Sequence, residues 1–228
     1  MREIALRFDN AWAALRRHGP VNYSRRLLFY FGRFAYKRHR AIVFRRDLTE
    51  PVDILDASAP LEFEFYSGNR NGDLHAFLDH HLRIDVVEAR LRDGWTPVLA
   101  YYRGTVVSVS WFNTSPIYLD TLECNLDYGP GAGYIEGSIT SEDMRGTGIA
   151  PAIRSRICRH LRGLGCKIVY VSAGEDNKAS HAVARKCGFT PFETIEVTRV
   201  LWHRRYRRRR LLREDTLTIR RQLLSPDS

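Results

Sequence analysis

In one stretch of the chain, apolar residues recur every four positions. They are Ile149, Ile153, Ile157 and Leu161, with arginines between them. This period predicts an amphipathic helix that ends near Gly163 and Gly165. The segment that begins at Tyr134 has the character of a strand, and a polar turn with Gly146 and Gly148 follows it. The pattern therefore predicts a strand, a glycine-rich loop and a helix in direct succession.

Similar patterns predict the elements on either side. Alternation and short apolar runs predict strands at 41–44, 61–66, 96–102, 105–113, 167–173 and 192–202, the last being the final strand. Helical periods predict helices at 2–18, 23–39, 73–92 and 177–187. Asp73 is the expected N-cap of the third helix, and Arg103-Gly104 is the expected turn of a hairpin. Residues 114–133 are rich in Gly and Pro, so this segment is expected to include a mobile loop.

The net charge of +10 is concentrated at the two ends of the chain. Residues 1–50 carry 12 basic and 4 acidic side chains, residues 199–228 carry 10 and 3, and the segment between carries 14 and 19. This division predicts ends that meet an anionic partner and a body that performs chemistry. The dense arginine tract at 203–213 is expected to be solvated or disordered.

Composition excludes several classes of protein. With 44% apolar residues the chain can build a core, so wholesale disorder is excluded. The chain has no run of 18 apolar residues, so the sequence predicts no membrane span. No secretory signal is recognisable either, so we expect a cytoplasmic protein. The four cysteines have neither C-x-x-C nor metal-ligand spacing, which predicts reduced thiols and no metal site.

The glycine-rich loop has the features of a phosphate-binding site. Gly146 and Gly148 allow the backbone to approach a ligand closely. Pro151 falls in the first helical turn, where its missing N–H costs nothing. A helix N-terminus offers free N–H groups and the positive end of its dipole to a phosphate. The loop lacks the spacings of dinucleotide and P-loop motifs; an ordinary strand–turn–helix connection is the alternative.

Two motifs together resemble the GNAT superfamily of N-acetyltransferases. Arg145-x-x-Gly148-x-Ala150, after a strand, resembles the acyl-coenzyme A loop of that family. A second motif about 30 residues later matches the family pattern at Asn177, Ser180, Lys186, Gly188 and Phe189. The order of predicted elements from 61 to 202 is also similar to the family's.

The resemblance implies an α/β fold with a mixed, splayed central sheet flanked by helices. A GNAT-like acyltransferase domain is expected at 51–202. Residues 1–50 are expected to form a basic helical N-terminal extension, and residues 203–228 a basic C-terminal tail. Both ends lie outside the resemblance.

The resemblance also implies an activity and a set of contacts. The activity is direct transfer of an acyl group, acetyl by default, from acyl-coenzyme A to a primary amine of a small molecule or peptide, with no metal. The pyrophosphate would lie on the amides of Gly146, Thr147, Gly148, Ile149 and Ala150, with Arg145 beside them. The pantetheine would pair with Ser138, Ile139 and Thr140, where their strand splays from 167–173. Asn177 and Ser180 would contact the coenzyme near the second motif.

Glu136 is the predicted general base. An amine attacks only when deprotonated, and some members of the family carry an acidic residue at this register. On a regular strand its side chain is expected to share a face with Ser138 and Thr140. Backbone N–H groups of the splayed strand are the expected donors to the thioester oxygen. The alternative is a carboxylate that is solvated or paired with an arginine.

The chain departs from the family at the leaving group. Many members have a tyrosine near the thiolate, and here that position is Ala184. A thiol has a pKa near ~8.5, so a general acid helps but is not required. His181, Tyr170 and Cys187 are the candidate substitutes, each with a structural role as the alternative.

Other partners and a different function stay open. A longer acyl chain, or an acidic acyl carrier protein that binds the basic ends, is an alternative donor. A different class of function is a coenzyme-binding module without catalysis, docked on membrane or nucleic acid. The basic ends would bring such a cytoplasmic protein to the anionic inner membrane surface as a peripheral protein. No motif predicts sequence-specific nucleic-acid recognition, and no pattern specifies an oligomeric state.

Overall fold

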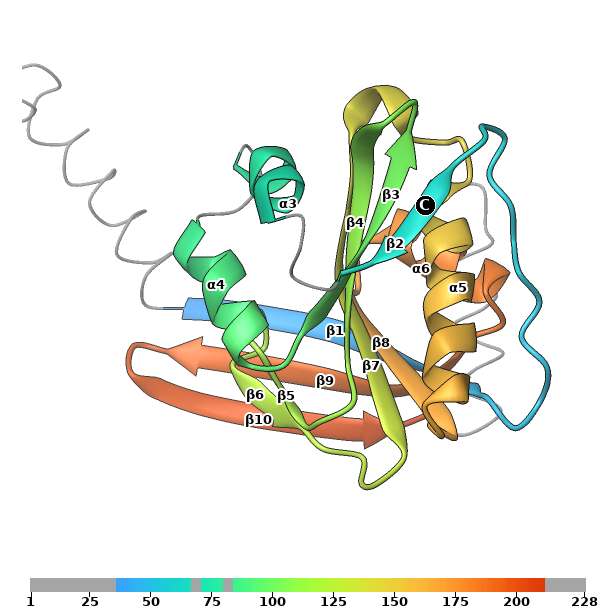
Figure 1. Cartoon of the computed structure of the whole chain (residues 1–228). Helices are drawn as coiled ribbons and strands as arrows, with labels where there is room; N and C mark the ends of the chain where they lie inside the picture. The colour runs from blue at the N-terminus through green and yellow to red at the C-terminus, as the bar shows by residue number, and fades with distance from the viewer. Residues whose placement is uncertain (1–35, 67–70, 80–83, 212–228) are drawn as a thin grey trace, which may run out of the picture. The chain divides into compact units, whose positions relative to one another are not determined.

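The computed structural model describes residues 36–66, 71–79 and 84–211 (Figure 1). Contacts divide the chain into two units. Of the described residues, the first unit holds 36–39 and 196–207, and the second holds 40–195 and 208–211. The predicted helix at 2–18, and the chain up to residue 35 and beyond 211, lie outside the described residues.

Eight strands form one mixed sheet. They are β1 (Tyr36–Asp47), β2 (Glu62–Phe65), β3 (Thr96–Tyr102), β4 (Thr105–Asn113), β7 (Ala132–Thr140), β8 (Ile168–Gly174), β9 (Thr190–Val200) and β10 (His203–Arg210). Their order is β10-β9-β1-β8-β7-β4-β3-β2. β7 and β8 are parallel, whereas β4 pairs with β7 in the antiparallel sense. A separate two-stranded ribbon is formed by β5 (Ile117–Leu119) and β6 (Cys124–Leu126).

Helices cover both faces of the sheet in the second unit (Figure 1). On one side lie α3 (Asn71–Leu78) and α4 (Ile84–Arg92); on the other lie α5 (Ile149–Gly163) and α6 (Lys178–Lys186). A short 3-10 helix, η1 (Glu142–Met144), leads from β7 to α5.

The core under α5 follows from the four-residue apolar period of that helix. Ile149, Ile153, Ile157 and Leu161 are each at most 1% exposed. They pack in one cluster with Phe112 of β4, Ile135 of β7 and Val169 of β8. Burying each such side chain contributes about 1.5–3 kcal/mol, so the amphipathic pattern fixes α5 against the sheet next to β7. The predicted strand–loop–helix is confirmed.

Two sequence predictions are wrong in the first half of the chain. The helix expected at 23–39 does not include residues 36–39, which begin β1, because pairing with neighbouring strands overrides local helical character. The helix expected at 73–92 is interrupted at Asp79, and its parts are α3 and α4. Asp73 is the third residue of α3, so it is not the N-cap.

The second half adds one unpredicted element and one wrong prediction. Residues 114–133 contain the β5–β6 ribbon as well as irregular segments, and this ribbon was not predicted. β9 is not the last strand, because residues 203–210 of the arginine tract form β10 at the edge of the sheet. An edge strand accommodates this charge since all eight of its residues stay exposed. The proposed boundaries at 50/51 and 202/203 stay a prediction.

Candidate active site

β7 and β8 separate in the middle of the sheet. Their parallel pairing runs from Ala132 opposite Ile168 to Ile135 opposite Val171. Beyond that point β8 keeps its pairing with β1, and β7 keeps its pairing with β4. The expected splay is therefore present, and the rest of β7 has an edge that β8 does not cover.

A β-bulge follows at Gly137. Trp111 of β4 lies opposite Glu136, but Val109 lies opposite Ile139, so β7 holds one extra residue between these pairs. Gly137 has φ of +63°, which side chains with a Cβ adopt only under strain. A Cβ there would also lie 2.2 Å from Nη1 of Arg90. The conformation favours glycine, and a Cβ would in addition require the end of the Arg90 side chain to move.

The bulge places Glu136 and the hydroxyl residues on opposite faces of the sheet. Ser138 Oγ lies 2.7 Å from Ser110 Oγ, and Thr140 Oγ1 lies 2.9 Å from Ser108 Oγ. Glu136 instead lies opposite Trp111, on the other face of β4. The prediction that Glu136 shares a face with Ser138 and Thr140 is wrong, because the extra residue reverses the alternation.

These two faces are the ones that α4 and α5 cover. Phe112, which shares its face of β4 with Ser110, belongs to the core cluster under α5. On the other face, the guanidinium of Arg90 in α4 lies 5.7 Å from the ring centre of Trp111 and 5.8 Å from that of Trp95. Glu136 is therefore on the α4 side, and the two hydroxyls are on the α5 side.

Burial raises the pKa of the half-buried Glu136 carboxyl above its ordinary value. The positive charge of Arg90 opposes this rise, and the negative charge of Asp120, just after β5, adds to it. A carboxylate whose pKa is raised is a stronger base than an exposed one. Its environment therefore fits the role of proton acceptor.

Arg90 was not singled out in the sequence. Its Nη1 atom is buried and has no hydrogen-bond partner within the described part of the chain. A glycine inside a strand signals a bulge or a close approach, so Gly137 was the available clue. No short-range sequence pattern connects Gly137 to α4, because Arg90 lies 47 positions away in the sequence.

The loop before α5 has free amide groups. Among the hydrogen bonds of the described residues, none has an amide of residues 146–150 as its donor. Gly148 takes the left-handed conformation at the helix N-cap, with φ of 86° and no side-chain cap. The carbonyl of Thr147 accepts a hydrogen bond from Ser58 N at 2.9 Å, which fixes the loop from behind. This donor set fits a phosphate group.

Arg145 lies next to these amides and remains accessible. Its side chain is 60% exposed, and Nη1 is 3.2 Å from Oε1 of Glu142. Such an exposed ion pair is weak, so Arg145 can turn to an anion at the loop. Contacts of Arg145 and of the strand Ser138–Thr140 with a coenzyme stay predictions.

Asn177 and Ser180 have a local structural role. Oδ1 of Asn177 accepts a hydrogen bond from Ser180 N at 3.0 Å, so Asn177 caps α6. Capping explains these two residue types at this spacing without a ligand. A further contact of the pair with the coenzyme stays a prediction.

The three candidates for a general acid are packed in the interior. The His181 ring lies 5.2 Å from that of Phe44, and Tyr170 stacks on Tyr128 at 3.9 Å. Burial raises the pKa of the Cys187 thiol, which disfavours a reactive thiolate. Ala184, at the position of the family tyrosine, is only 1% exposed. The geometry favours structural roles for all three.

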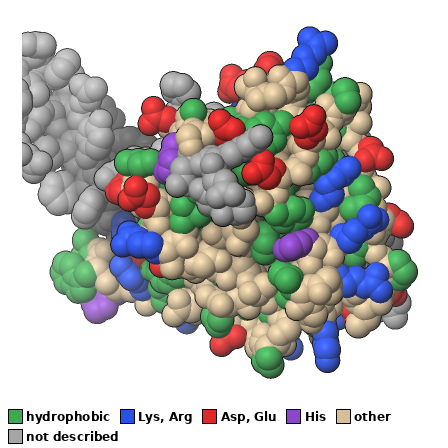
Figure 2. Space-filling model, viewed as in Figure 1, with side chains coloured by type: hydrophobic (Ala, Val, Ile, Leu, Met, Phe, Trp, Pro, Cys, Tyr) green, Lys and Arg blue, Asp and Glu red, His purple; other side chains and the backbone are tan. Residues whose placement is uncertain are grey.

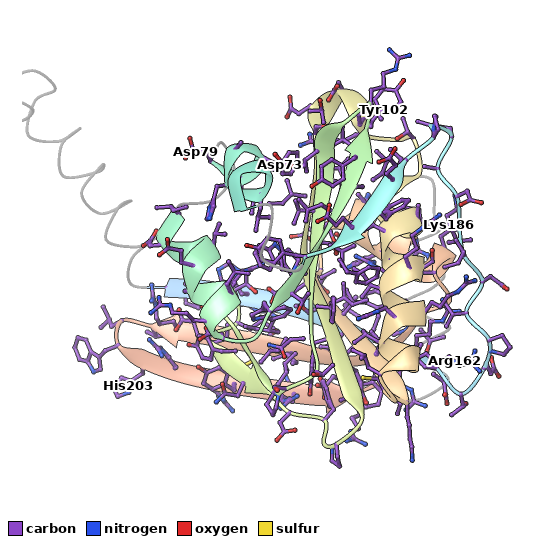
Figure 3. All side chains as sticks on the ribbon, viewed as in Figure 1. Asp73, Asp79, Tyr102, Arg162, Lys186 and His203 are labelled. Carbon is purple, nitrogen blue, oxygen red and sulfur yellow. The ribbon has the colours of Figure 1, made fainter. Side chains whose placement is uncertain are left out.

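Two cavities adjoin α3. One of about 620 Å³ is lined by Asp73 and Phe77 of α3, Val107 of β4 and Asp143 of η1. Another of about 200 Å³ lies between α3 and α4. Figure 3 marks Asp73 on α3, where it receives a hydrogen bond from Tyr101 at 3.4 Å. Neither lining includes Glu136.

The surface charge differs between the two sides. Figure 2 shows acidic side chains gathered around α3, and Lys and Arg side chains over α5. In the described ranges, no cluster of three or more His, Cys, Asp or Glu has metal-site geometry. No described helix is long and apolar enough to cross a membrane.

Comparison with known proteins agrees with this geometry. Residues 62–189 match the acetyltransferase (GNAT) family. The chain belongs to this family. Its members are acyltransferases that use acyl-coenzyme A as donor, and the matched range includes β7, the glycine-rich loop, α5 and α6. The recognition made from the two sequence motifs is therefore confirmed. No curated protein is significantly similar to the chain in sequence.

Solved structures show the same GNAT fold. A GNAT-family protein from Novosphingobium aromaticivorans has a TM-score of 0.51 at 11% identity, over 72% of this chain and 66% of that one. A GCN5-related N-acetyltransferase from Sphaerobacter thermophilus has a TM-score of 0.54 at 16% identity, over 79% and 56%. The glucosamine N-acetyltransferase region of a fungal multi-domain GH3 β-N-acetylglucosaminidase has 0.53 at 15%, over 77% and 22%. The chain thus spans less than two thirds of each, and the likeness establishes the fold.

Proposed function

We propose that this GNAT protein is an N-acyltransferase that moves an acyl group, by default acetyl, from acyl-coenzyme A directly to a primary amine. One observation carries the proposal. The bulge at Gly137 puts a carboxylate of raised pKa on the α4 side of β7, while the free loop amides lead into α5 and β8 leaves the edge of β7 beyond Ile135 uncovered. Donor and acceptor can then approach the same point of the strand from opposite faces.

The chain's own groups fit the donor. The free amides of residues 146–150 would hold the pyrophosphate, and Arg145 would add a positive charge. The backbone of residues 138–140, left uncovered by β8, would pair with the amides of the pantetheine. The hydrogen-bonded pairs Ser108–Thr140 and Ser110–Ser138 keep this edge in place.

Glu136 would remove the proton from the attacking amine. An amine arrives mostly as an ammonium ion, so a carboxylate is needed both to attract it and to accept a proton. Burial raises the pKa of Glu136, and the positive charge of Arg90 opposes that rise. The raised pKa makes the carboxylate a better proton acceptor.

The thioester carbonyl and the leaving group need little further help. Amide N–H groups of β7 next to the bulge can donate to the oxygen as it gains charge. The sulfur leaves as a thiolate, with an ordinary thiol pKa of about 8.5. The buried positions of His181, Tyr170 and Cys187 support transfer without a general acid.

The surroundings of Glu136 favour a cationic acceptor. The charge of Asp120 acts on Glu136, and acidic side chains gather over α3 on the same side of the sheet (Figure 2). The negative charges of Glu136 and Asp120 attract an ammonium group and repel a carboxylate. Small-molecule or peptide amines with positive charge are the proposed acceptors.

A panel experiment tests the proposal. The full chain is incubated with acetyl-coenzyme A and a set of amines of differing charge, and release of free thiol is followed. Medium- and long-chain donors and an acyl carrier protein form the second arm. We expect thiol release with acetyl-coenzyme A that requires an amine, and a preference for cationic amines. Thiol release confined to acyl carrier protein or long-chain donors would contradict the choice of donor. Coenzyme binding without turnover for any amine would contradict catalysis.

A further inference from the structure

The turn between β9 and β10 carries large apolar side chains in an exposed position. Val200, Leu201, Trp202 and Tyr206 are 49%, 46%, 77% and 43% exposed. All four belong to the first unit. We call them, together with Arg204, Arg205 and Arg207, the hairpin tip. Figure 3 labels His203 at this end of the hairpin, and Figure 2 shows apolar, basic and histidine side chains together there.

The backbone of the turn makes this arrangement more unusual. Leu201 has φ of +55°, a conformation that is uncommon for residues other than glycine, asparagine and aspartate. Tight hairpin turns favour those three residue types. The chain instead places Leu201 and Trp202 at the turn. Leu201 has a strained backbone, and both side chains are exposed, so they add little to a core. Strained residues of this kind cluster at functional positions.

Cationic side chains surround the apolar ones. The described part of the first unit contains Lys37, Arg38, Arg199, Arg204, Arg205 and Arg207, and one carboxylate, Glu196, which gives a net charge of +5. Arg38 pairs with Glu196 at 2.6 Å. Arg205 and Arg207 alternate along β10 and so project from one face of the strand. The charge of the described residues is therefore complementary to an anionic partner.

The combination of apolar and cationic side chains distinguishes between the possible anionic partners. Tryptophan prefers the boundary between headgroups and acyl chains, and arginines bind anionic headgroups. Trp202 and Tyr206 have rings on which a nucleic-acid base could stack. Val200 and Leu201 have none, and their aliphatic side chains gain free energy only by entering an apolar layer. An anionic bilayer satisfies both the apolar and the cationic residues.

We propose that the hairpin tip docks the protein on an anionic lipid bilayer. Leu201 and Trp202 enter the headgroup boundary, and Arg204, Arg205 and Arg207 contact the phosphates of the lipids. The contact is a peripheral one and lies in the first unit, whereas the candidate active site lies in the second. It does not depend on the proposed acyl transfer.

Co-sedimentation of the full chain with vesicles tests this. The vesicles contain phosphatidylcholine alone or phosphatidylcholine with about 30% phosphatidylglycerol. We expect binding only to the anionic vesicles, weakening as salt is raised. Trp202→Ala should weaken binding by about tenfold or more, and Arg205→Glu with Arg207→Glu by at least about tenfold.

Matched variants isolate the hairpin tip from the rest of the basic chain. Leu164→Ala removes an apolar side chain that is 57% exposed in the second unit. Arg162→Glu with Lys167→Glu reverses two exposed charges there. Both controls should bind vesicles like the wild type, and all variants should keep the wild-type circular dichroism spectrum.

Two results would overturn the proposal. One is equal vesicle binding by the wild type and by Trp202→Ala. The other is tighter binding to duplex DNA or RNA than to anionic vesicles at the same salt, with loss in the Arg205/Arg207 variant but not in Trp202→Ala. Brominated lipid quenches the fluorescence of a tryptophan that enters the bilayer. Quenching in the wild type that is weaker in Trp202→Phe would place the indole of Trp202 in the boundary region.

Discussion

The guanidinium of Arg90 lies beside the bulge, in the space into which a Cβ on Gly137 would project. Such a Cβ would lie only 2.2 Å from Nη1 of Arg90. The cation also lies 5.8 Å and 5.7 Å from the centres of the Trp95 and Trp111 rings. An α4 side chain, a β4 aromatic and the β7 bulge therefore meet at this point. This contact links the geometry of the bulge to the charge that acts on Glu136.

Gly137→Ala should lower both stability and activity. A Cβ at positive φ costs roughly 1–2 kcal/mol, and displacing Arg90 adds to this cost. Gly104→Ala is the matched control, because Gly104 has φ of +77° and a Cβ added to it would meet nothing within 4 Å. We expect a larger loss in the free energy of unfolding, measured by denaturant titration, for Gly137→Ala. Equal losses would mean that the Arg90 contact is unimportant.

Arg90→Met should move the pH dependence of turnover. Burial raises the pKa of Glu136 and Arg90 lowers it, so removing the cation raises it further. Because the base must be ionised, the acidic limb of kcat/KM should shift to higher pH. Arg90→Lys keeps the charge and should restore much of the profile. An unchanged limb in Arg90→Met would show that this arginine does not tune the base.

Arg145→Glu should weaken donor binding without affecting chemistry. A negative side chain beside the free amides repels the pyrophosphate, so KM for acetyl-coenzyme A should rise by about tenfold while kcat changes little. Arg162→Glu reverses an exposed charge at the other end of α5 and should leave this KM unaltered. Equal KM values in both variants and the wild type would argue against the placement of the pyrophosphate.

Glu193→Ala should destabilise the fold near β9 and β10. The Glu193 side chain is 5% exposed; it accepts a hydrogen bond from Tyr128 and lies 2.7 Å from Nη2 of Arg208. Its removal leaves both donors without that acceptor, at a cost of roughly 1–3 kcal/mol. Thermal unfolding of Glu193→Ala, Arg208→Met and the double variant checks this. Additive effects would contradict direct coupling.

The elements around the glycine-rich loop were predictable because their signals are local. The four-residue period of Ile149 to Leu161 fixes α5, and the alternation around Arg103-Gly104 fixes the β3–β4 hairpin. Each depends on residues only a few positions apart, so pattern and structure agree. The recognition of the family had the same basis, since its two motifs are continuous stretches.

The side of the sheet on which Glu136 lies was not predictable in this way. The extra residue at Gly137 appears only when β7 is aligned with β4, and one residue reverses every side chain beyond it. Arg90 comes from a helix far away in sequence. The arginine tract at 203–213 was not predicted to contain a strand, because nothing in its own composition reveals that β9 supplies a partner.

The most direct test of the account compares Glu136→Gln with the wild type in two measurements on the same preparations. Calorimetry gives the affinity for coenzyme A, and thiol release with acetyl-coenzyme A and the best amine gives kcat. Glu62→Gln, an exposed carboxylate on β2, is the matched control. We predict an unchanged coenzyme affinity in all three proteins and a kcat reduced by about 100-fold or more in Glu136→Gln alone. Full turnover by Glu136→Gln at every pH would contradict the assignment of the base and the two-sided site built on it.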